Sequence, residues 1–152
     1  MPRIEVVTEI NAPIARVFDL SRSIDVHQES QTHHRERAIA GRTAGLIEQG
    51  EQVTWEATHF GIRQRLTSRI VEMRPPTYFR DSLVKGAFKR FDHDHHFESL
   101  PDGRTRVRDS FDFNSPFGPF GRVVDHLILK RYMRRLIVDR NQAIKRMAEA
   151  AS

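Results

Sequence analysis

The stretch Gln52–Ile70 reads QVTWEATHFGIRQRLTSRI and contains two alternating segments joined at Gly61. Before the glycine, one face holds Val53, Trp55, Ala57 and His59. After it, one face holds Ile62, Gln64, Leu66, Ser68 and Ile70, and the opposite face holds Arg63, Arg65, Thr67 and Arg69. A period of two is typical of a strand with one buried face, and a glycine between two such runs favours a turn. The stretch therefore predicts a hairpin in an antiparallel sheet with one apolar and one charged face.

Further strands are predicted on both sides of this hairpin. They cover Arg3–Ile10, His33–Ile39, Tyr78–Val84, Phe88–Glu98 and Thr105–Phe113. Between the first two strands the chain favours two short helices: Pro13 suits the first turn of one, and Ser23 can cap the other. Short connections such as Pro101-Asp102-Gly103 imply that neighbouring strands are antiparallel.

After the last strand, the segment from Pro119 to Met147 has the pattern of one long helix. It contains a single glycine, Gly121, and no further proline. Its apolar residues fall near helical spacing at Val124, Leu127, Ile128, Met133, Leu136, Ile137, Ile144 and Met147. At 1.5 Å per residue the helix would be roughly 40–45 Å long. We expect it to cover the apolar face of the sheet, because no other predicted element is large enough.

These elements predict an α+β fold. A curved antiparallel sheet of about seven strands wraps around the long C-terminal helix, and two short helices follow strand 1. The 152 residues suffice for one domain with a substantial core, and no repeat or linker divides them. Residues 1–152 are therefore expected to form a single ligand-binding domain, with a cavity where the sheet and the helix diverge.

The composition excludes several classes of site and disfavours others. The chain has no cysteine, which excludes disulfides, thiolate metal sites and cysteine nucleophiles and fits a cytoplasmic location. The net charge is +5, but arginines are interleaved with Asp and Glu, so we expect no nucleic-acid partner. The apolar runs are too short for a membrane span, and the N-terminus lacks a signal-peptide pattern. No glycine motif cradles phosphates, and no cofactor is expected.

Polar residues interrupt the apolar faces of the predicted strands. Asp81, His93, His95 and Asp109 each stand between apolar or aromatic neighbours at alternate positions, and His59 ends another inward face. Because a buried charge is costly unless it is paired, an Asp–His hydrogen bond is expected. Three interpretations remain open: a structural polar cluster, recognition of a polar group on an apolar ligand, and general acid–base catalysis by His93, His95 and Asp109.

The run Asp92–His96 also has the residue types of a metal site. Neighbouring residues on a strand point to opposite faces, so His93 and His95 can act together whereas His96 cannot join them. His59 would then supply a third nitrogen. We expect satisfied hydrogen bonds rather than a metal site at these residues.

The walls of the cavity are expected from aromatic residues on inward strand faces, namely Trp55, Phe79, Phe91, Phe111 and Phe113. Phe117 and Phe120 follow in a segment punctuated by glycines, where they would either gate the cavity or anchor the helix. Four arginines crowd the long helix, at Arg131, Arg134, Arg135 and Arg140. Three of the four are expected to face solvent, and one could reach an anionic head group of a ligand.

Five motifs resemble a known superfamily. They are I-x-A-P-x-x-x-V-F over Ile10–Phe18, VTWEATHFG over Val53–Gly61, F-x-D-x-x-x-x-G-x-F over Phe79–Phe88, FDHDHHF over Phe91–Phe97 and T-x-V-x-D over Thr105–Asp109. With them the chain resembles the SRPBCC superfamily, also called START-like or polyketide cyclase/dehydrase-like, which has the helix-grip fold. The resemblance covers nearly the whole chain and implies an interior small-molecule site. Members bind lipids, hormones or polyketide intermediates, and a minority are cyclases, dehydratases or dehydrogenase-associated subunits.

We therefore expect a monomer or homodimer that binds a small hydrophobic or amphipathic ligand of the lipid, polyketide or aromatic type. The expected ligand-binding residues are Trp55, His59, Phe79, Asp81, Phe91, His93, His95, Phe111, Phe113, Phe117 and Phe120. One alternative is a cyclase/dehydratase-type enzyme that uses an Asp–His acid/base pair, and the sequence leaves open whether the protein is an enzyme. A second alternative is a basic interaction module, whose binding to an acidic partner would be sensitive to salt.

Overall fold

The computed structural model describes residues 3–114, 123 and 125–150. Its elements are β1 (Arg3–Ile10), α1 (Ile14–Ser21), α2 (Ile24–Ser30), the 3-10 helix η1 (Thr32–His34), β2 (Arg37–Gly41), β3 (Gln52–His59), β4 (Ile62–Arg74), β5 (Tyr78–Lys85), β6 (Arg90–Ser99), β7 (Thr105–Asn114), the π-helix η2 (Asp125–Leu129) and α4 (Lys130–Ala150). This order confirms the predicted α+β fold, with seven strands, two short helices after β1 and a long C-terminal helix.

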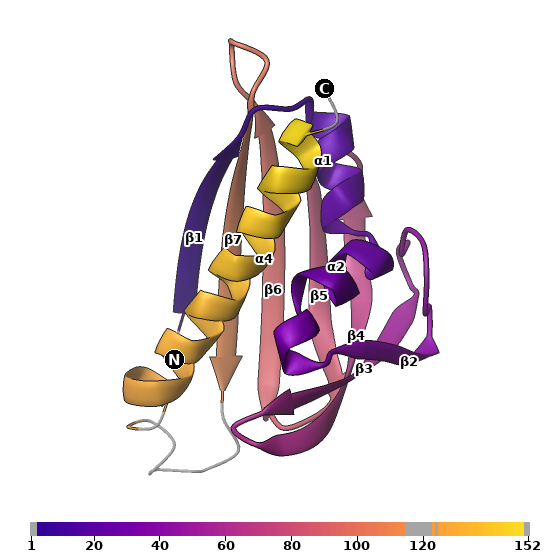
Figure 1. Ribbon diagram of the computed structural model, residues 1–152, viewed down its shortest axis with the longest axis vertical. Helices are drawn as coiled ribbons and strands as arrows, with labels where there is room; N and C mark the ends of the chain where they lie inside the picture. The colour runs from indigo at the N-terminus through magenta and orange to yellow at the C-terminus, as the bar shows by residue number, and fades with distance from the viewer. Residues whose placement is uncertain (1–2, 115–122, 124, 151–152) are drawn as a thin grey trace.

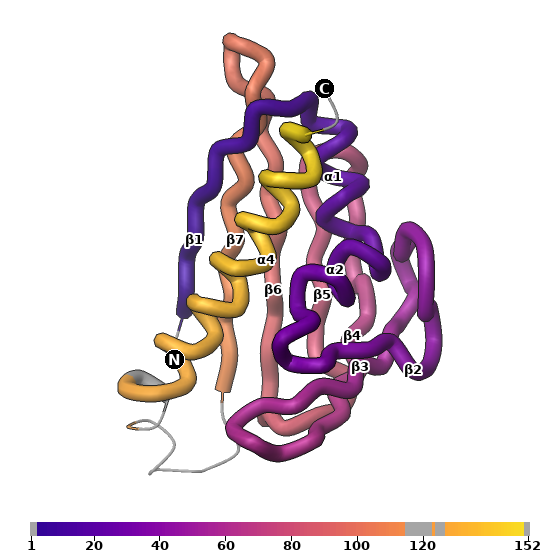
Figure 2. Tube along the Cα trace, viewed as in Figure 1, coloured from indigo at the N-terminus to yellow at the C-terminus, as the bar shows by residue number. Residues whose placement is uncertain are grey.

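The seven strands form one antiparallel sheet in the order β1-β7-β6-β5-β4-β3-β2. Strands that follow one another from β2 to β7 are paired neighbours, and β1 closes the order by pairing with β7. In Figure 1, α4 runs diagonally across β1, β7 and β6 on one face of the sheet, and α1 and α2 lie beside it on the same face. The strands β3 and β4 bend round below α2, which gives the sheet the curvature that the fold requires (Figure 2).

The predicted hairpin at Gly61 is confirmed. His59 pairs with Ile62, so Phe60 and Gly61 form a two-residue turn. Both turn residues have positive φ, 53° at Phe60 and 75° at Gly61. Two consecutive positive φ angles are typical of the type I′ turn, whose twist matches that of the adjoining strands. The turn leaves Phe60 and Ile62 largely exposed at the tip of the hairpin.

Two predicted elements have bounds that differ from the structure by more than two residues. The strand predicted over His33–Ile39 begins at Arg37 and ends at Gly41, and His33 and His34 belong to η1 instead. A Cβ at Gly41 would lie 2.2 Å from the carbonyl oxygen of Gln52, so the end of β2 requires glycine. The long helix was predicted from Pro119, and the described part of α4 begins at Lys130 after the π-helical η2.

The core consists of two apolar clusters separated by a polar layer. One cluster contains Phe18, Phe79, Phe97, Val107 and Ile144, among others. The other contains Ile4, Phe91, Phe111, Phe113 and Ile137. Along each inward face that crosses the core, the polar residues lie between the two clusters: Thr8 on β1, Asp81 on β5, His93 and His95 on β6, Asp109 on β7, and Arg140 and Asn141 on α4. The polar layer therefore runs through both the sheet and the helix.

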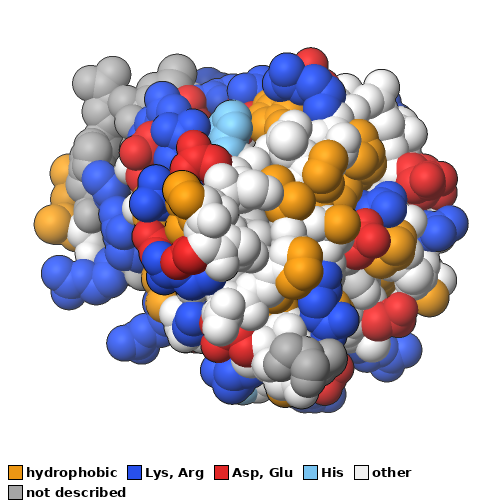
Figure 3. Space-filling view, turned by 90° about the horizontal axis from the view of Figure 1, so that it is seen from above, with side chains coloured by type: hydrophobic (Ala, Val, Ile, Leu, Met, Phe, Trp, Pro, Cys, Tyr) orange, Lys and Arg blue, Asp and Glu red, His pale blue; other side chains and the backbone are white. Residues whose placement is uncertain are grey.

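The opposite face of the sheet is charged, as predicted. Asp94 of β6 accepts hydrogen bonds from Arg80 and from the hydroxyl of Tyr78. Asp92 accepts a hydrogen bond from Ser82. Figure 3, which views the molecule from above and not onto this face, shows Lys and Arg side chains interspersed with Asp and Glu on the visible surface. No described helix has the length and apolar character that crossing a membrane would require.

Candidate functional site

A pocket of about 490 Å³ lies between the sheet and α4. Its apolar wall includes Trp55, Ala57, Leu66, Phe88, Phe91, Phe111, Leu129, Met133 and Ile137. Polar side chains also reach it, among them Asp81 and His93 from the sheet and Arg140 from α4. The pocket thus has an apolar body, and one part of its wall is made by the polar layer of the core.

Two Asp–His hydrogen bonds cross the polar layer diagonally. Asp81 lies directly opposite His93 in the pairing of β5 with β6, and His95 lies opposite Asp109 in the pairing of β6 with β7. The two shortest contacts run the other way: His95 Nε2 is 2.7 Å from Asp81 Oδ1, and His93 Nε2 is 2.9 Å from Asp109 Oδ1. His95 Nδ1 also lies 3.2 Å from Asp109 Oδ1. The two imidazoles stack with centroids 3.8 Å apart. Each histidine is therefore fixed by a carboxylate of a neighbouring strand.

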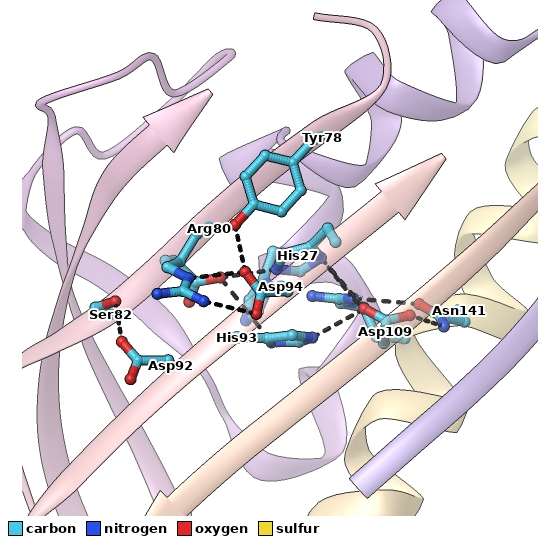
Figure 4. Close-up of polar contacts among 12 residues, drawn as sticks. His27, Tyr78, Arg80, Ser82, Asp92, His93, Asp94, Asp109 and Asn141 are labelled. Carbon is cyan, nitrogen blue, oxygen red and sulfur yellow. Dashed lines mark hydrogen bonds and ion pairs between the residues drawn. The ribbon is translucent and has the colours of Figure 1, made fainter. Parts of the chain in front are cut away.

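Asp109 is held by the helix as well as by the histidines. Arg140 Nη2 donates to Asp109 Oδ1 at 2.9 Å, and Asn141 Nδ2 donates to Asp109 Oδ2 at 2.6 Å. Figure 4 shows Asp109 between His93 and Asn141. Burial opposes ionisation of Asp109, but the Arg140 guanidinium and the two histidines outweigh it and hold the pKa of this carboxyl well below its usual range.

The two histidines differ in basicity. Burial, followed by the neighbouring His95, lowers the pKa of His93 to about 4. Burial would also lower the pKa of His95, but hydrogen bonds to Asp109 and Asp81 outweigh it and raise that pKa above its ordinary value. Asp81 is the more accessible carboxylate, with 21% of its side chain exposed, and contacts with His95 and His93 overcome burial to lower its pKa. His93 is thus the neutral member of the pair and His95 the more basic one.

A second polar group lies at the edge of the pocket, where η1, β3 and α4 meet. His59 Nδ1 is 2.6 Å from the hydroxyl of Tyr132, and His34 Nδ1 is 3.5 Å from the same hydroxyl. Phe60 packs against the Tyr132 ring with centroids 4.4 Å apart. Burial lowers the pKa of His59 and of His34. This group connects the β3–β4 hairpin to the helix.

The structure divides the predicted site residues into groups. Trp55, His59, Asp81, Phe91, His93 and Phe111 line the pocket. His95 and Asp109 lie behind that wall at 1% and 0% exposure, and Phe79 stacks on His95 within the core. Phe113 is also a core residue. Phe117 and Phe120 lie outside the described residues. His59 hydrogen-bonds Tyr132 and does not join the Asp–His pairs, so the metal triad considered with His59 does not form.

Several site residues were missed by the sequence patterns. Three of the four helix arginines are exposed, as predicted, whereas Arg140 is 7% exposed, pairs with Asp109 and also lines the pocket. Its position was a usable signal, because it lies three residues after Ile137 and four before Ile144 on the buried face. Tyr132 and Gln31 carried no such signal; Gln31 donates from Nε2 to the carbonyl of Leu136 and links α2 to α4.

One described group has the residue types of a metal site. The ligand atoms of Asp81, His93 and His95 all lie within 4.8 Å of one another. The third candidate metal ligand beside His93 and His95 is therefore Asp81 in the structure, where the sequence had suggested His59. The second candidate chemistry is proton transfer, since His93 reaches the pocket and its other ring nitrogen is oriented by Asp109.

Comparisons with known proteins agree with this architecture. Residues 1–149 match the model of a family described as polyketide cyclase / dehydrase and lipid transport. No curated protein sequence matches the chain significantly. The structure is similar to TTHA0849 from Thermus thermophilus, with a TM-score of 0.78 and 21% identity over 99% of both chains.

Two further solved structures have the same fold. A START superfamily protein from Mycobacterium smegmatis has a TM-score of 0.75 and 10% identity over 99% of both chains. Zhui aromatase/cyclase from Streptomyces sp. R1128 has a TM-score of 0.69 and 12% identity, covering 98% of this chain and 97% of that chain. At these identities the likeness concerns the fold.

Proposed function

Because the chain belongs to the polyketide cyclase / dehydrase and lipid transport family, we propose that it binds a small hydrophobic or amphipathic molecule in the pocket between the sheet and α4. The ligand class is a lipid, a polyketide or an aromatic compound. The observation that carries the proposal is the pocket itself, an apolar chamber with a polar part of its wall at Asp81 and His93.

The size of the pocket supports this proposal. Its volume of about 490 Å³ falls within the ~300–1,000 Å³ that is usual for small-molecule sites. Burying apolar ligand surface against Trp55, Phe91 and Phe111 would contribute about 25 cal/mol per Å² removed from water. The apolar wall would supply affinity, and the polar residues would select the orientation of the guest.

The polar part of the wall favours a ligand group that donates a hydrogen bond. Asp81 is ionised, because its pKa is lowered, and its side chain is partly exposed. A hydroxyl or amine of the ligand would therefore be favoured beside it, whereas a ligand carboxylate would be repelled. We expect hydroxylated aromatic or polyketide ligands to bind more tightly than fatty acids of similar size.

Native mass spectrometry of the purified full chain, followed by denaturing extraction, tests the proposal. A stoichiometric lipid, polyketide or aromatic adduct that dissociates on unfolding would support it. An unliganded mass, together with no saturable thermal shift in a panel of lipids and aromatic compounds, would contradict it. Adding the hydroxylated and carboxylated forms of one aromatic scaffold tests the expected preference for a donor.

A second candidate function is acid–base catalysis of the cyclase or dehydratase type. It is favoured by one observation: His93 lines the pocket while Asp109 fixes its Nε2 from behind. A neutral His93 could accept a proton from a bound carbonyl compound. The test compares ligands extracted from the wild type and from His93→Gln. A precursor on the variant and its dehydrated product on the wild type, differing by one water, would indicate catalysis, and identical ligands would argue against it.

A further inference from the structure

We propose that Asp81, His93 and His95 form a binding site for one divalent first-row transition-metal ion at the polar part of the pocket wall. Two imidazoles and one carboxylate are a ligand set that Zn²⁺, Co²⁺ and Fe²⁺ accept. The three side chains come from two adjacent strands, and their ligand atoms lie within 4.8 Å of one another.

The orientation of the two rings carries this inference. Asp109 Oδ1 contacts His93 through Nε2 at 2.9 Å and His95 through Nδ1 at 3.2 Å. The remaining nitrogens, His93 Nδ1 and His95 Nε2, are those that approach Asp81. Two stacked imidazoles therefore present one nitrogen each to the same carboxylate, on the side away from Asp109.

The distances suit a small cation after a shift of Asp81 and a tilt of the two histidine rings, because ring lone pairs lie in the ring plane and the rings now stack at an interplanar angle of 25°. Asp81 Oδ1 is 2.7 Å from His95 Nε2 and 4.0 Å from His93 Nδ1. Ligands bound tetrahedrally at ~2.0–2.1 Å from Zn²⁺ lie about 3.3 Å apart, between these two distances. Centring the Asp81 carboxylate between the two nitrogens would satisfy this separation, and Asp81 is the partly exposed member of the group.

Asp109 is placed to hold the two histidines without itself binding the ion. Metal-bound histidines usually donate their other N–H to a carboxylate or carbonyl, which fixes the tautomer and the ring orientation. Here a single carboxylate serves both rings and is itself fixed by Arg140 and Asn141. Because this support comes from both β7 and α4, the two nitrogens are positioned before any ion arrives.

Charge and access also favour a cation. The positive charge of Arg140 is already paired with Asp109, so the carboxylate of Asp81 has no arginine or lysine of its own among its ion pairs with described residues. A divalent ion would supply a positive charge beside Asp81. Asp81 and His93 both line the pocket, so an ion held there would keep positions open for water or for an oxygen atom of the guest. The inference is independent of the proposed organic ligand, since the ion can be tested alone.

The test is titration of the full chain, first stripped with EDTA, with Co²⁺ followed by absorbance and with Zn²⁺ followed by calorimetry. One equivalent of the ion is expected to bind per chain, and bound Co²⁺ should give visible absorption bands typical of a coordination site of low symmetry. Asp81→Asn preserves size and removes the charge, and it should weaken binding by about tenfold or more. His93→Gln should abolish the Co²⁺ bands.

Two control variants separate this site from other histidines. His96→Gln removes a histidine of β6 that packs on Tyr78 at the opposite face, and His59→Gln alters the group around Tyr132. Both should bind the ion like the wild type. Circular dichroism and thermal unfolding verify that each variant is folded. Absence of stoichiometric binding to the wild type would overturn the inference, as would binding that survives Asp81→Asn and is lost in His59→Gln. A ligand found by native mass spectrometry would leave the proposed function standing in either case.

Discussion

Arg140 of α4 donates a 2.9 Å hydrogen bond to Asp109 of β7, and the two side chains are only 8% and 0% exposed. This buried ion pair joins the helix to the middle of the sheet. Burying two charges costs several kcal/mol per ion unless hydrogen bonds compensate, and Asp109 also receives bonds from Asn141 and His93. Removing one partner would leave the other charge buried without compensation.

The first prediction concerns this pair. Asp109→Asn keeps the shape of the side chain but removes its charge, so Arg140 loses its counterion. We expect the free energy of unfolding to fall by about 3–5 kcal/mol, measured by urea denaturation. Asp112→Asn is the matched control, because Asp112 lies on the same strand as Asp109, is 39% exposed and pairs with Arg90 of β6. Its loss should cost at most about 1 kcal/mol. Equal losses for the two variants would contradict a special role of Asp109.

The second prediction is a loss of stability in acid caused by His93. Its pKa falls from 6.5 to about 4 on folding, so the unfolded chain binds a proton that the native protein does not. As far as His93 is concerned, the free energy of unfolding therefore has its full value above pH 6.5. It decreases as the pH falls towards 4, by at most about 3 kcal/mol. Urea unfolding at a series of pH values measures this dependence.

His93→Gln should reduce the slope between these pH values. It should not remove the slope, because the pKa values of His34, His59 and His96 are also lowered. His95 acts in the opposite direction: its raised pKa adds stability that is present in acid and is lost as the pH rises through that pKa. An unchanged slope in His93→Gln would show that His93 does not stay neutral in the fold.

The third prediction concerns the bond between His59 and Tyr132. Because it links the β3–β4 hairpin to α4, a double-mutant cycle with His59→Ala and Tyr132→Phe should give a coupling energy of about 0.5–1.5 kcal/mol. The matched cycle uses His34→Ala, whose nitrogen is 3.5 Å from the same hydroxyl, and should give a smaller value. A coupling near zero in the first cycle would mean that the hairpin and the helix are held by other contacts.

The strands and their inward faces could be predicted from the sequence, whereas the contacts among the site residues could be predicted only in part. Alternation placed His93, His95, Asp81 and Asp109 on the buried face correctly, because a period of two is a local property of the chain. Which aspartate bonds which histidine depends on the pairing of three strands: the two shortest bonds cross that register diagonally, and His95 also contacts its register partner Asp109. Local patterns contain no information about such a diagonal.

Two residues, Arg140 on the helix and His59 at the edge of the pocket, show what could not be predicted from the sequence pattern. The spacing of Arg140 to Ile137 and Ile144 was a signal of its burial, but its partner could not be predicted, since Asp109 lies opposite it on β7. His59 continues the inward face of β3 but lies at its end, where η1 and α4 supply its partners. In both cases the role of the residue is decided by a contact between segments far apart in sequence.

The fourth prediction concerns a variant that fills part of the pocket with a larger side chain. Ala57 is 5% exposed and lines the pocket, so Ala57→Phe would place a ring in the space that a guest needs. We expect this variant to fold and to carry no ligand in native mass spectrometry, with ligand-induced quenching of Trp55 fluorescence abolished. Val84→Phe adds a ring at a 50% exposed position of β5 and should bind ligand like the wild type. If Ala57→Phe keeps the ligand at wild-type stoichiometry, the guest binds elsewhere, and the pocket between the sheet and α4 is not the site.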